Sequence, residues 1–316
     1  MSKVLYDCLI IGGGPAGLAA ATSLARLQHK CLVFDSGVYR NALSKHMHNV
    51  IGWDHRDPAD LRSQARQDLD NRYKGIVSFQ NATIREIRKL ESGRFEAVDE
   101  SGNVHSGKKI VLATGVRDIL PDIPGYAECW TKGIFHCLFC FGYEDRGKKS
   151  AGVLAIPLLT ETFFITHVGN NALQLAEKIT IYTNGDGAMT AKLREALVKP
   201  DPRITLETRK IARLDMKSSD ASDVIVTFED GTTTTEGLIA HPPLVEINGP
   251  FVDQLSLELN PTGEIKVTPP FNQTSVEGVF ACGDAATMTR AVAQAAVMGA
   301  MAAVGAAAQV EAEGPH

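Results

Sequence analysis

The hydrophobic positions near the N-terminus form two short apolar runs, separated by a glycine-rich turn and a segment rich in alanine and leucine. Residues 5–11 and 31–35 are runs of the kind found in strands buried on both faces of a parallel sheet. Residues 18–27, between them, have the composition of a helix. This order predicts a strand–helix–strand unit at the start of the chain.

The same pattern returns in the middle of the chain. Residues 153–156 and 179–183 predict strands, and residues 160–177 predict the helix between them. Prolines at 121 and 124, and the run at 241–243, predict hinges on either side. We therefore expect an α/β protein with an outer domain of residues 1–118 and 245–316, and a central domain of residues 119–244 inserted in it.

The remaining segments predict further elements of the outer domain. Residues 58–73 read as a helix with proline in its first turn, and residues 76–105 alternate like strands with turns at 91–93 and 101–102. Further strands are predicted at 109–115 and 279–281, followed by a long alanine-rich helix from about residue 290. We expect residues 311–316 to fray.

Composition and charge narrow the class of protein. The chain has 316 residues and a net charge of −5, which fits two domains and argues against a nucleic-acid partner. No apolar run is expected to approach the ~20 residues of a membrane span. We also expect no secretory leader, because the N-terminal residues lead directly into the predicted first strand. We expect a cytoplasmic protein with no membrane partner, whose six cysteines do not form a disulfide framework.

The first turn has the spacing of a dinucleotide-binding loop. Gly12 permits a tight turn, Gly14 lets the backbone approach a pyrophosphate, and Gly17 allows close packing of helix on strand. Asp35 ends the second strand about twenty residues on, where an acid accepts hydrogen bonds from ribose hydroxyls. The alternative is a glycine turn in another kind of α/β protein. The predicted cofactor-binding residues of this segment are Gly12, Gly14, Pro15, Ala16, Gly17 and Asp35.

A second candidate for chemistry is the run His136-Cys137-Leu138-Phe139-Cys140. Two thiols at this spacing can close a disulfide, and a neighbouring positive group lowers the pKa of a thiol. A structural zinc site normally has two further ligands nearby, and the other cysteines stand alone in the sequence. We expect a redox pair, Cys137 and Cys140, and no metal; a zinc site or an inert thiol pair remain the alternatives.

The whole chain resembles the low-molecular-weight thioredoxin reductases. The residues that carry this resemblance are the glycine loop, Ala113-Thr114-Gly115, the Cys-x-x-Cys in the middle domain, and Gly283-Asp284 near the end. The resemblance implies two Rossmann-like domains, FAD as cofactor and a homodimer. It also implies that the flavin is held by Ala113, Thr114, Gly115, Gly283 and Asp284, and by Ala291 and Val292 at the start of the last helix.

Four stretches, residues 34–41, 46–56, 114–119 and 136–140, are more similar to the fungal gliotoxin-type dithiol oxidases of epidithiodiketopiperazine biosynthesis. Arg40 and Asn49, which lie in these stretches, are added to the expected cofactor contacts. This resemblance implies oxidation of a small-molecule dithiol to a disulfide, with electrons passed through FAD to O2 to give H2O2. It implies that Cys137 exchanges with substrate and that Cys140 passes electrons to the flavin.

The second strand–helix–strand unit lacks the residues of a nicotinamide site. The strand at 153–156 is followed by residues 157–162, Pro-Leu-Leu-Thr-Glu-Thr, in place of a glycine loop. The strand at 179–183 is followed by no basic residue before Lys192, although a 2′-phosphate site needs one. We expect NADPH binding to be lost; a degenerate site with weak binding is the alternative.

One position departs from both families, which usually have an aspartate directly after the second cysteine. Here that residue is Phe141, which cannot titrate. Histidine titrates near neutral pH, so His136 is the first candidate for the proton acceptor. The alternatives are Glu144, Asp145, His46 and His48. Three functions compete: a dithiol oxidase, a thioredoxin reductase-type enzyme, and a flavin-binding protein with little turnover. Phe141 in place of the aspartate keeps the last of these open.

Overall fold

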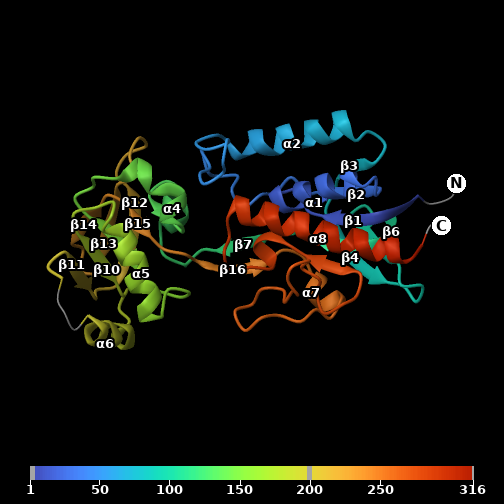
Figure 1. Ribbon diagram of the computed structural model, residues 1–316. Coiled ribbons are helices and arrows are strands. Elements are labelled where there is room, and N and C mark those ends of the chain that lie inside the picture. Colours follow the sequence, from blue (N-terminus) through green and yellow to red (C-terminus); the bar gives the residue numbers. More distant parts are fainter. Residues whose placement is uncertain (1–3, 198–200, 315–316) are drawn as a thin grey trace. The chain divides into compact units, whose positions relative to one another are not determined.

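The structure, a computed structural model, describes residues 4–197 and 201–314. The chain divides into two compact units (Figure 1). The outer unit comprises Met1–Arg117 and Glu246–His316, and the inserted unit comprises Asp118–Val245. Each boundary lies one residue from the expected one. The α/β fold class with two Rossmann-type units is confirmed.

The outer unit is built on a seven-stranded sheet that branches at its longest strand, β6 (Val104–Leu112). The C-terminal half of β6 pairs in parallel with β1 (Leu5–Ile11) and β17 (Val279–Ala281), and its N-terminal half pairs with β5 (Phe95–Asp99). The parallel side continues through β2 (Cys31–Asp35) to β3 (Val77–Asn81), and the antiparallel side ends at β4 (Ile84–Lys89). The carboxyl ends of the parallel strands therefore meet at one edge.

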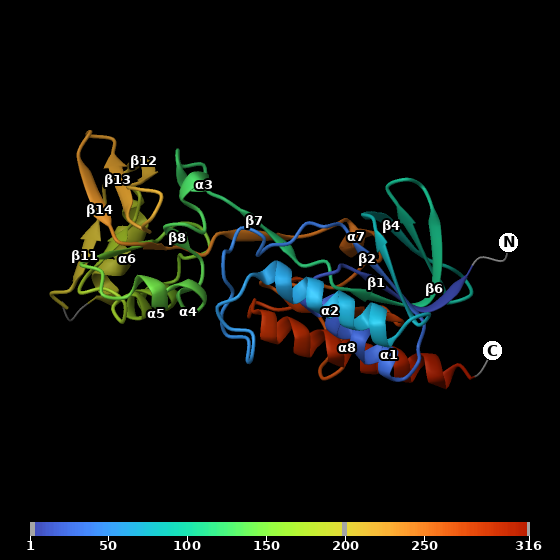
Figure 2. The ribbon, with the colours of Figure 1, turned by 90° about the horizontal axis from the view of Figure 1, so that it is seen from above.

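Helices α1 (Pro15–Arg26) and α8 (Val292–Ala312) run side by side next to this sheet (Figures 1 and 2). Small residues allow their close approach, because a Cβ on Gly299 would come within 2.0 Å of the backbone oxygen of Ala16. The polar helix α2 (Pro58–Arg72) packs on α1, and the short α7 (Phe251–Gln254) contacts β4. The start of α1 is thus held between the sheet and α8.

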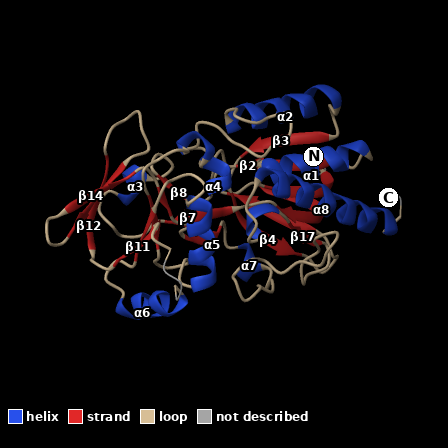
Figure 3. Ribbon diagram, turned by 60° about the vertical axis from the view of Figure 1, so that its left-hand side comes forward, coloured by secondary structure: helices blue, strands red, loops and turns tan. Residues whose placement is uncertain are grey.

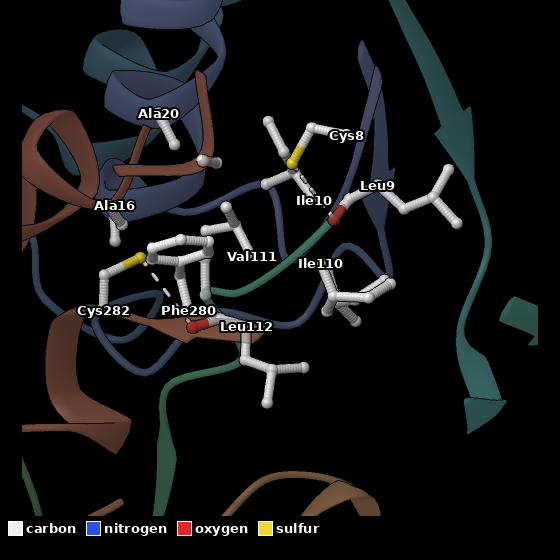
Figure 4. Packing of buried hydrophobic residues seen from close by; sticks show 14 of the residues in the cluster. Cys8, Leu9, Ile10, Ala16, Ala20, Ile110, Val111, Leu112, Phe280 and Cys282 are labelled. Atoms are coloured by element: carbon white, nitrogen blue, oxygen red, sulfur yellow. Dashed lines mark hydrogen bonds between the residues drawn. The ribbon is translucent and has the colours of Figure 1, made fainter. Parts of the chain in front are cut away.

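The core of the outer unit lies between the parallel strands and these helices (Figure 4). Cys8, Leu9 and Ile10 on β1 and Val111 on β6 are fully buried, which explains the continuous apolar runs. Cys282 is also fully buried, and burial raises the pKa of its thiol to about 12. Its thiol therefore stays protonated, which fits its expected role as a small core residue.

The inserted unit contains a five-stranded parallel sheet and a three-stranded antiparallel sheet (Figure 3). The parallel sheet has the order β11 (Ile204–Glu207), β10 (Ile179–Tyr182), β9 (Ala151–Leu154), β15 (Ile239–Ala240), β8 (Ile134–Phe135). The antiparallel sheet comprises β12 (Ile211–Met216), β13 (Val224–Phe228) and β14 (Thr233–Glu236). The helices are α3 (Tyr126–Cys129), α4 (Leu138–Phe141), α5 (Thr162–Ala172) and α6 (Gly187–Ala196). Strands β7 (Val116–Ile119) and β16 (Leu244–Ile247), where the chain passes between the units, pair with each other.

Several expectations about helices were wrong. Helix α5 is shorter than the predicted 160–177, and α6 was not predicted from the sequence. Residues 311–312 are not frayed but end α8, where Glu311 lies 3.2 Å from the ring of His29. The next residues up to 314 are described, with Glu313 bound to Lys109, while residues 315–316 lie outside the described part.

The expectation that no apolar segment reaches the length of a membrane span was also wrong. Among the described residues, one helix, α8, is long enough and apolar enough to cross a membrane, judged by length and composition alone. The hydropathy of this segment was underestimated because its apolar character comes from many alanines rather than from a run of large side chains. Its packing against α1, β6 and β17 accounts for the same composition in a core helix.

Candidate active site

The glycine loop between β1 and α1 contains two positions where any side chain would collide with backbone. Gly12 has φ of 120°, and a Cβ there would lie 2.2 Å from the oxygen of Ala113. A Cβ on Gly17 would lie 1.9 Å from the oxygen of Gly12. No described atom lies within 4 Å of a Cβ built on Gly14, so open space adjoins the backbone there. This is the position at which the sequence predicts approach of a pyrophosphate.

Two helix starts of the outer unit are left open to an anionic or polar ligand. Helix α1 begins at Pro15 after the N-cap Gly14, and α8 begins at Val292 after the N-cap Ala291. No described side chain caps either start, so their first N–H groups have no side-chain acceptor. The residues present therefore fit a dinucleotide, because free N–H groups and the helix dipole bind phosphate and developing negative charge.

Asp35 lies at the carboxyl end of β2, beside the glycine loop, and is 3% exposed. A Cβ on Gly13 would lie 2.3 Å from its carboxylate, which shows how closely the acid covers the turn. The carboxylate accepts hydrogen bonds from the N–H of Gly37, the hydroxyl of Tyr39 and the guanidinium of Arg66. Tyr39 and Arg66 were not predicted as site residues, since nothing in their local sequence marks them.

The segment after β6 approaches the same edge of the sheet. Gly115 has φ of 65°, and Asn248 fixes the turn by donating to the oxygen of Thr114 and the oxygen of Gly115. The Thr114 hydroxyl is buried and has no hydrogen-bond partner among the described residues. A buried hydroxyl of this kind is expected to bind a ligand or water. Asn248 is a further residue that the sequence did not reveal.

The last predicted segment, Gly283 and Asp284, follows β17. Gly283 has φ of 72°, and a Cβ there would lie 3.0 Å from the Cβ of Ala16. Asp284 forms an ion pair of 3.1 Å with Arg40, which comes from the loop after β2. The outer unit thus brings together the predicted residues of four distant segments. Asn49 lies in the loop between β2 and α2, exposed and with φ of 62°.

The two cysteines of the inserted unit are joined as a disulfide. Cys137 and Cys140 have Cα atoms 5.2 Å apart, and Cys137 immediately precedes the single turn of α4. The backbone N–H of Cys140 donates to the oxygen of Cys137. The pair is therefore in a geometry that can accept two electrons as a disulfide. Its part in turnover stays a prediction.

Aromatic rings surround the residue expected to take the proton. The ring of Phe141 stacks on Phe135 at 5.2 Å and meets the ring of His136 edge-on at 5.6 Å. The ring centroid of Trp130 lies 5.6 Å from that of His136, and the two ring planes are inclined by 34°. Phe141 therefore packs among aromatic rings beside the disulfide and offers no group that titrates. His136 stays the first candidate for the proton acceptor.

The other candidates for this role differ in their surroundings. Asp145 accepts a hydrogen bond from Ser222 and lies 3.7 Å from Lys148, so its carboxylate is already engaged. Glu144 is exposed. In the outer unit, His46 stacks on His55 with ring centroids 4.1 Å apart, and His48 lies 3.0 Å from His55 between ring nitrogens.

Comparison with known proteins gives the family. Residues 6–152 match the family described as pyridine nucleotide-disulphide oxidoreductase. The chain is 44% identical to the thioredoxin reductase aclD of Aspergillus oryzae over 98% of each chain. It is 42% identical to the thioredoxin reductase tcpT of Claviceps purpurea over 93% of this chain and 91% of that one.

The chain belongs to the thioredoxin reductase family. An oxidoreductase from Agrobacterium tumefaciens has the same fold, with a TM-score of 0.83 at 29% identity over 97% of this chain and 99% of that one. Membership makes the protein an oxidoreductase of a flavin-dependent family and confirms the resemblance on which the site prediction rests.

In the inserted unit, the turn after β9 contains no glycine, unlike the glycine loop after β1 in the outer unit. Leu158 in that turn has φ of 77°, and α5 begins after Glu161, whose carboxylate accepts no capping hydrogen bond from the described helix. After β10, Asp186 caps α6 by accepting from the N–H of Met189. Acidic side chains thus stand at the starts of both α5 and α6.

Proposed function

We propose that the protein is an FAD-dependent dithiol oxidase that closes a disulfide in a small-molecule dithiol of the diketopiperazine type. The electrons pass through Cys137 and Cys140 to FAD and then to O2, giving H2O2. The observation that carries this proposal is the pair of acidic helix starts in the inserted unit, Glu161 at α5 and Asp186 at α6. A nucleotide phosphate would meet like charge there, and residues 155–161 before α5 contain no glycine that would allow close backbone approach.

The outer unit supports FAD as the cofactor. The open space at Gly14, the two uncapped helix starts and the buried Thr114 hydroxyl fit a flavin dinucleotide. We propose that Gly14, Pro15 and Ala16 bind the pyrophosphate, Asp35 the ribose, and Ala291 and Val292 the flavin pyrimidine. When bound, FAD accepts two electrons from the cysteine pair and delivers them to O2.

The exchange steps balance as follows. One substrate thiolate attacks Sγ of Cys137, which breaks the disulfide and releases Cys140 as a thiolate. The second substrate thiolate attacks the substrate sulfur of the mixed disulfide, which releases Cys137 and closes the substrate disulfide. The substrate loses two protons and two electrons, and the cysteine pair holds the electrons. We propose His136 as the group that accepts a proton from the attacking thiol.

The test of electron flow is anaerobic stopped-flow absorbance of the oxidised flavin, with excess NADPH and, separately, with excess dithiothreitol or a reduced diketopiperazine dithiol. We expect bleaching by the dithiol, recovery on admission of air, and one H2O2 for each disulfide formed. NADPH is expected to bleach the flavin at no useful rate. Fast bleaching by NADPH would replace the oxidase by a thioredoxin reductase, and no bleaching by any dithiol would leave a flavin-binding protein.

The proton step is tested with His136→Ala. We expect a loss of turnover of about 100-fold, in the range of general base catalysis, with partial recovery on adding imidazole. The matched control is His167→Ala, because His167 lies on α5 with its ring bonded to Asn171. Full turnover of His136→Ala would exclude this histidine as the proton acceptor.

We also propose that the enzyme acts in the cytoplasm as a homodimer, without nucleic acid or membrane. The four cysteines outside the disulfide are buried free thiols, as a reducing compartment favours. Sedimentation of the yellow protein tests the dimer, and microscopy of a tagged chain tests the compartment. A monomer, or a membrane-bound signal, would contradict the respective proposal.

A further inference from the structure

We propose that Tyr39 and Arg66 are positioning residues of the cofactor site, which hold Asp35 for the adenosine ribose of FAD and so favour FAD over FMN. This inference rests on the proposal that the outer unit binds FAD. It concerns a network of side chains from α2 and the loop after β2, which the glycine-loop pattern does not contain.

The hydrogen bonds of Asp35 leave little freedom to its carboxylate. Oδ1 accepts from the N–H of Gly37 at 2.9 Å. Oδ2 accepts from the hydroxyl of Tyr39 at 2.6 Å and from Nη1 of Arg66 at 2.9 Å. An ionised carboxylate accepts about four hydrogen bonds, two at each oxygen. One position, on Oδ1, therefore remains for a ribose hydroxyl, and the other contacts fix the direction in which it points.

Arg66 is itself fixed from two sides. Its Nη2 donates to Asn81 at the end of β3 at 3.2 Å, and its guanidinium lies 4.5 Å from the centre of the Phe79 ring. The ion pair with Asp35 is formed at a carboxylate that is 3% exposed, where screening by water is weak. Loss of this guanidinium would leave a buried carboxylate without its cation.

Tyr39 is held by the second arginine on the same face of α2. The guanidinium of Arg62 lies 3.8 Å from the centre of the Tyr39 ring and donates to Asn41 at 3.0 Å. Arg62 is buried, and it forms no ion pair with a carboxylate of the described residues. Burial, together with the bond to Asp35, raises the pKa of Tyr39 to about 12. The hydroxyl therefore remains a donor at working pH.

The experiment compares flavins that differ only in the adenosine part. The full chain is freed of flavin, and the Kd values for FAD and FMN are measured by fluorescence for wild type, Arg66→Met, Arg66→Lys and Tyr39→Phe. Methionine keeps an apolar stem over Phe79, and phenylalanine keeps the ring beneath Arg62. The control is Arg72→Met, which changes an exposed arginine at the end of α2.

We expect Arg66→Met to weaken FAD binding ~10- to 100-fold and Tyr39→Phe ~3- to 10-fold, as for charged and neutral hydrogen bonds to a carboxylate. Arg66→Lys should recover part of the loss, and the Kd for FMN should change less than about 3-fold throughout. Equal weakening of FAD and FMN would overturn the inference, because it would mean that the network only stabilises the fold. Unchanged FAD binding in Arg66→Met would overturn it as well.

The outcome is separable from that of the proposed function. A wild type that binds FAD but does not oxidise dithiols would remove the oxidase proposal, while FAD-selective weakening in Arg66→Met would still support this inference. Conversely, full dithiol oxidation together with unchanged FAD affinity in the variants would remove only this inference.

Discussion

Each unit contains a strand, a turn and a helix in succession, β1–α1 in the outer unit and β9–α5 in the inserted unit, and the two differ in the turn. In the outer unit only Gly12, Gly13 and Gly14 separate β1 from α1, and no described side chain caps the helix. In the inserted unit residues 155–161 separate β9 from α5, and the last of them is Glu161. The strand–helix skeleton is thus shared, while the residues before the helix differ between the two units.

The strands that follow these two helices, β2 and β10, also differ in the residues at their carboxyl ends. Strand β2 ends at Asp35, whose carboxylate faces the glycine loop. Strand β10 is followed by Thr183, which is fully buried and bonded to Thr190, and then by Asp186, which caps α6. The carboxylate of Asp35 accepts hydrogen bonds from Tyr39 and Arg66 of other segments, whereas that of Asp186 accepts from the backbone of its own helix. A shared fold therefore does not by itself establish what each unit binds.

The largest effect on activity is expected from changes to the disulfide. These variants test whether the inserted unit carries the chemistry while the outer unit binds the cofactor. Cys137→Ser and Cys140→Ser should each lower dithiol oxidation at least about 1,000-fold, because a hydroxyl cannot form the disulfide, while flavin content stays at the wild-type level. The control Cys129→Ala changes a buried free cysteine of the same unit. Near-normal turnover in either serine variant would make the pair structural.

The next largest effect is expected on flavin content, and it compares a glycine of the loop before α1 with a glycine at the start of α6. Gly12→Ala should yield protein without flavin, because a Cβ would lie 2.2 Å from the oxygen of Ala113 and the φ of 120° alone costs roughly 1–3 kcal/mol. The control Gly187→Ala, at the start of α6, should keep flavin and stability, since no described atom lies within 4 Å. Absorbance and thermal unfolding of both purified variants measure this. Normal flavin content in Gly12→Ala would contradict the predicted site.

A smaller effect concerns acid sensitivity, which we assign to the inserted unit. His241 is fully buried, its ring is 2.7 Å from the Tyr126 hydroxyl, and burial lowers its pKa to about 4. An unfolded histidine titrates near 6.5, so the unfolded state binds more protons between pH 6.5 and 4 and stability is lost as pH falls. The full contribution is roughly 3 kcal/mol.

His241→Gln should remove most of this pH dependence. Denaturant unfolding of wild type and variant at pH 7 and pH 4.5 measures it, and the two proteins should differ in their loss of unfolding free energy by about 2 kcal/mol. An equal loss in both would mean that other groups cause the acid sensitivity.

The smallest effect is expected at the capped helix of the inserted unit. Asp186→Ala should lower the free energy of unfolding by about 1 kcal/mol, because the N–H of Met189 loses its acceptor. Glu195→Ala, which changes an exposed acid on the same helix, serves as control. A neutral or stabilising Asp186→Ala would suggest that the acid was kept for some purpose other than capping.

Local patterns were sufficient for the elements that carry their own signal. The apolar run of β1, the glycine turn and the Cys-x-x-Cys were each read from adjacent residues, and the structure places them in strand, turn and disulfide. Helix α6 was not predicted, because its apolar residues are few and its start depends on Asp186 as cap. The apolar character of α8 was underestimated because alanine is weakly apolar and gives no strong run.

By itself, the sequence determined the two α/β units, the family and the identity of the paired cysteines, since these depend on short-range spacing and on residue types. Only the tertiary structure showed that Tyr39 and Arg66 meet Asp35, and that Asn248 closes the turn after Thr114. These contacts join residues up to 134 positions apart, so no local pattern records them. They arise because parallel strands end at one edge of a sheet, where distant loops are brought within hydrogen-bonding distance.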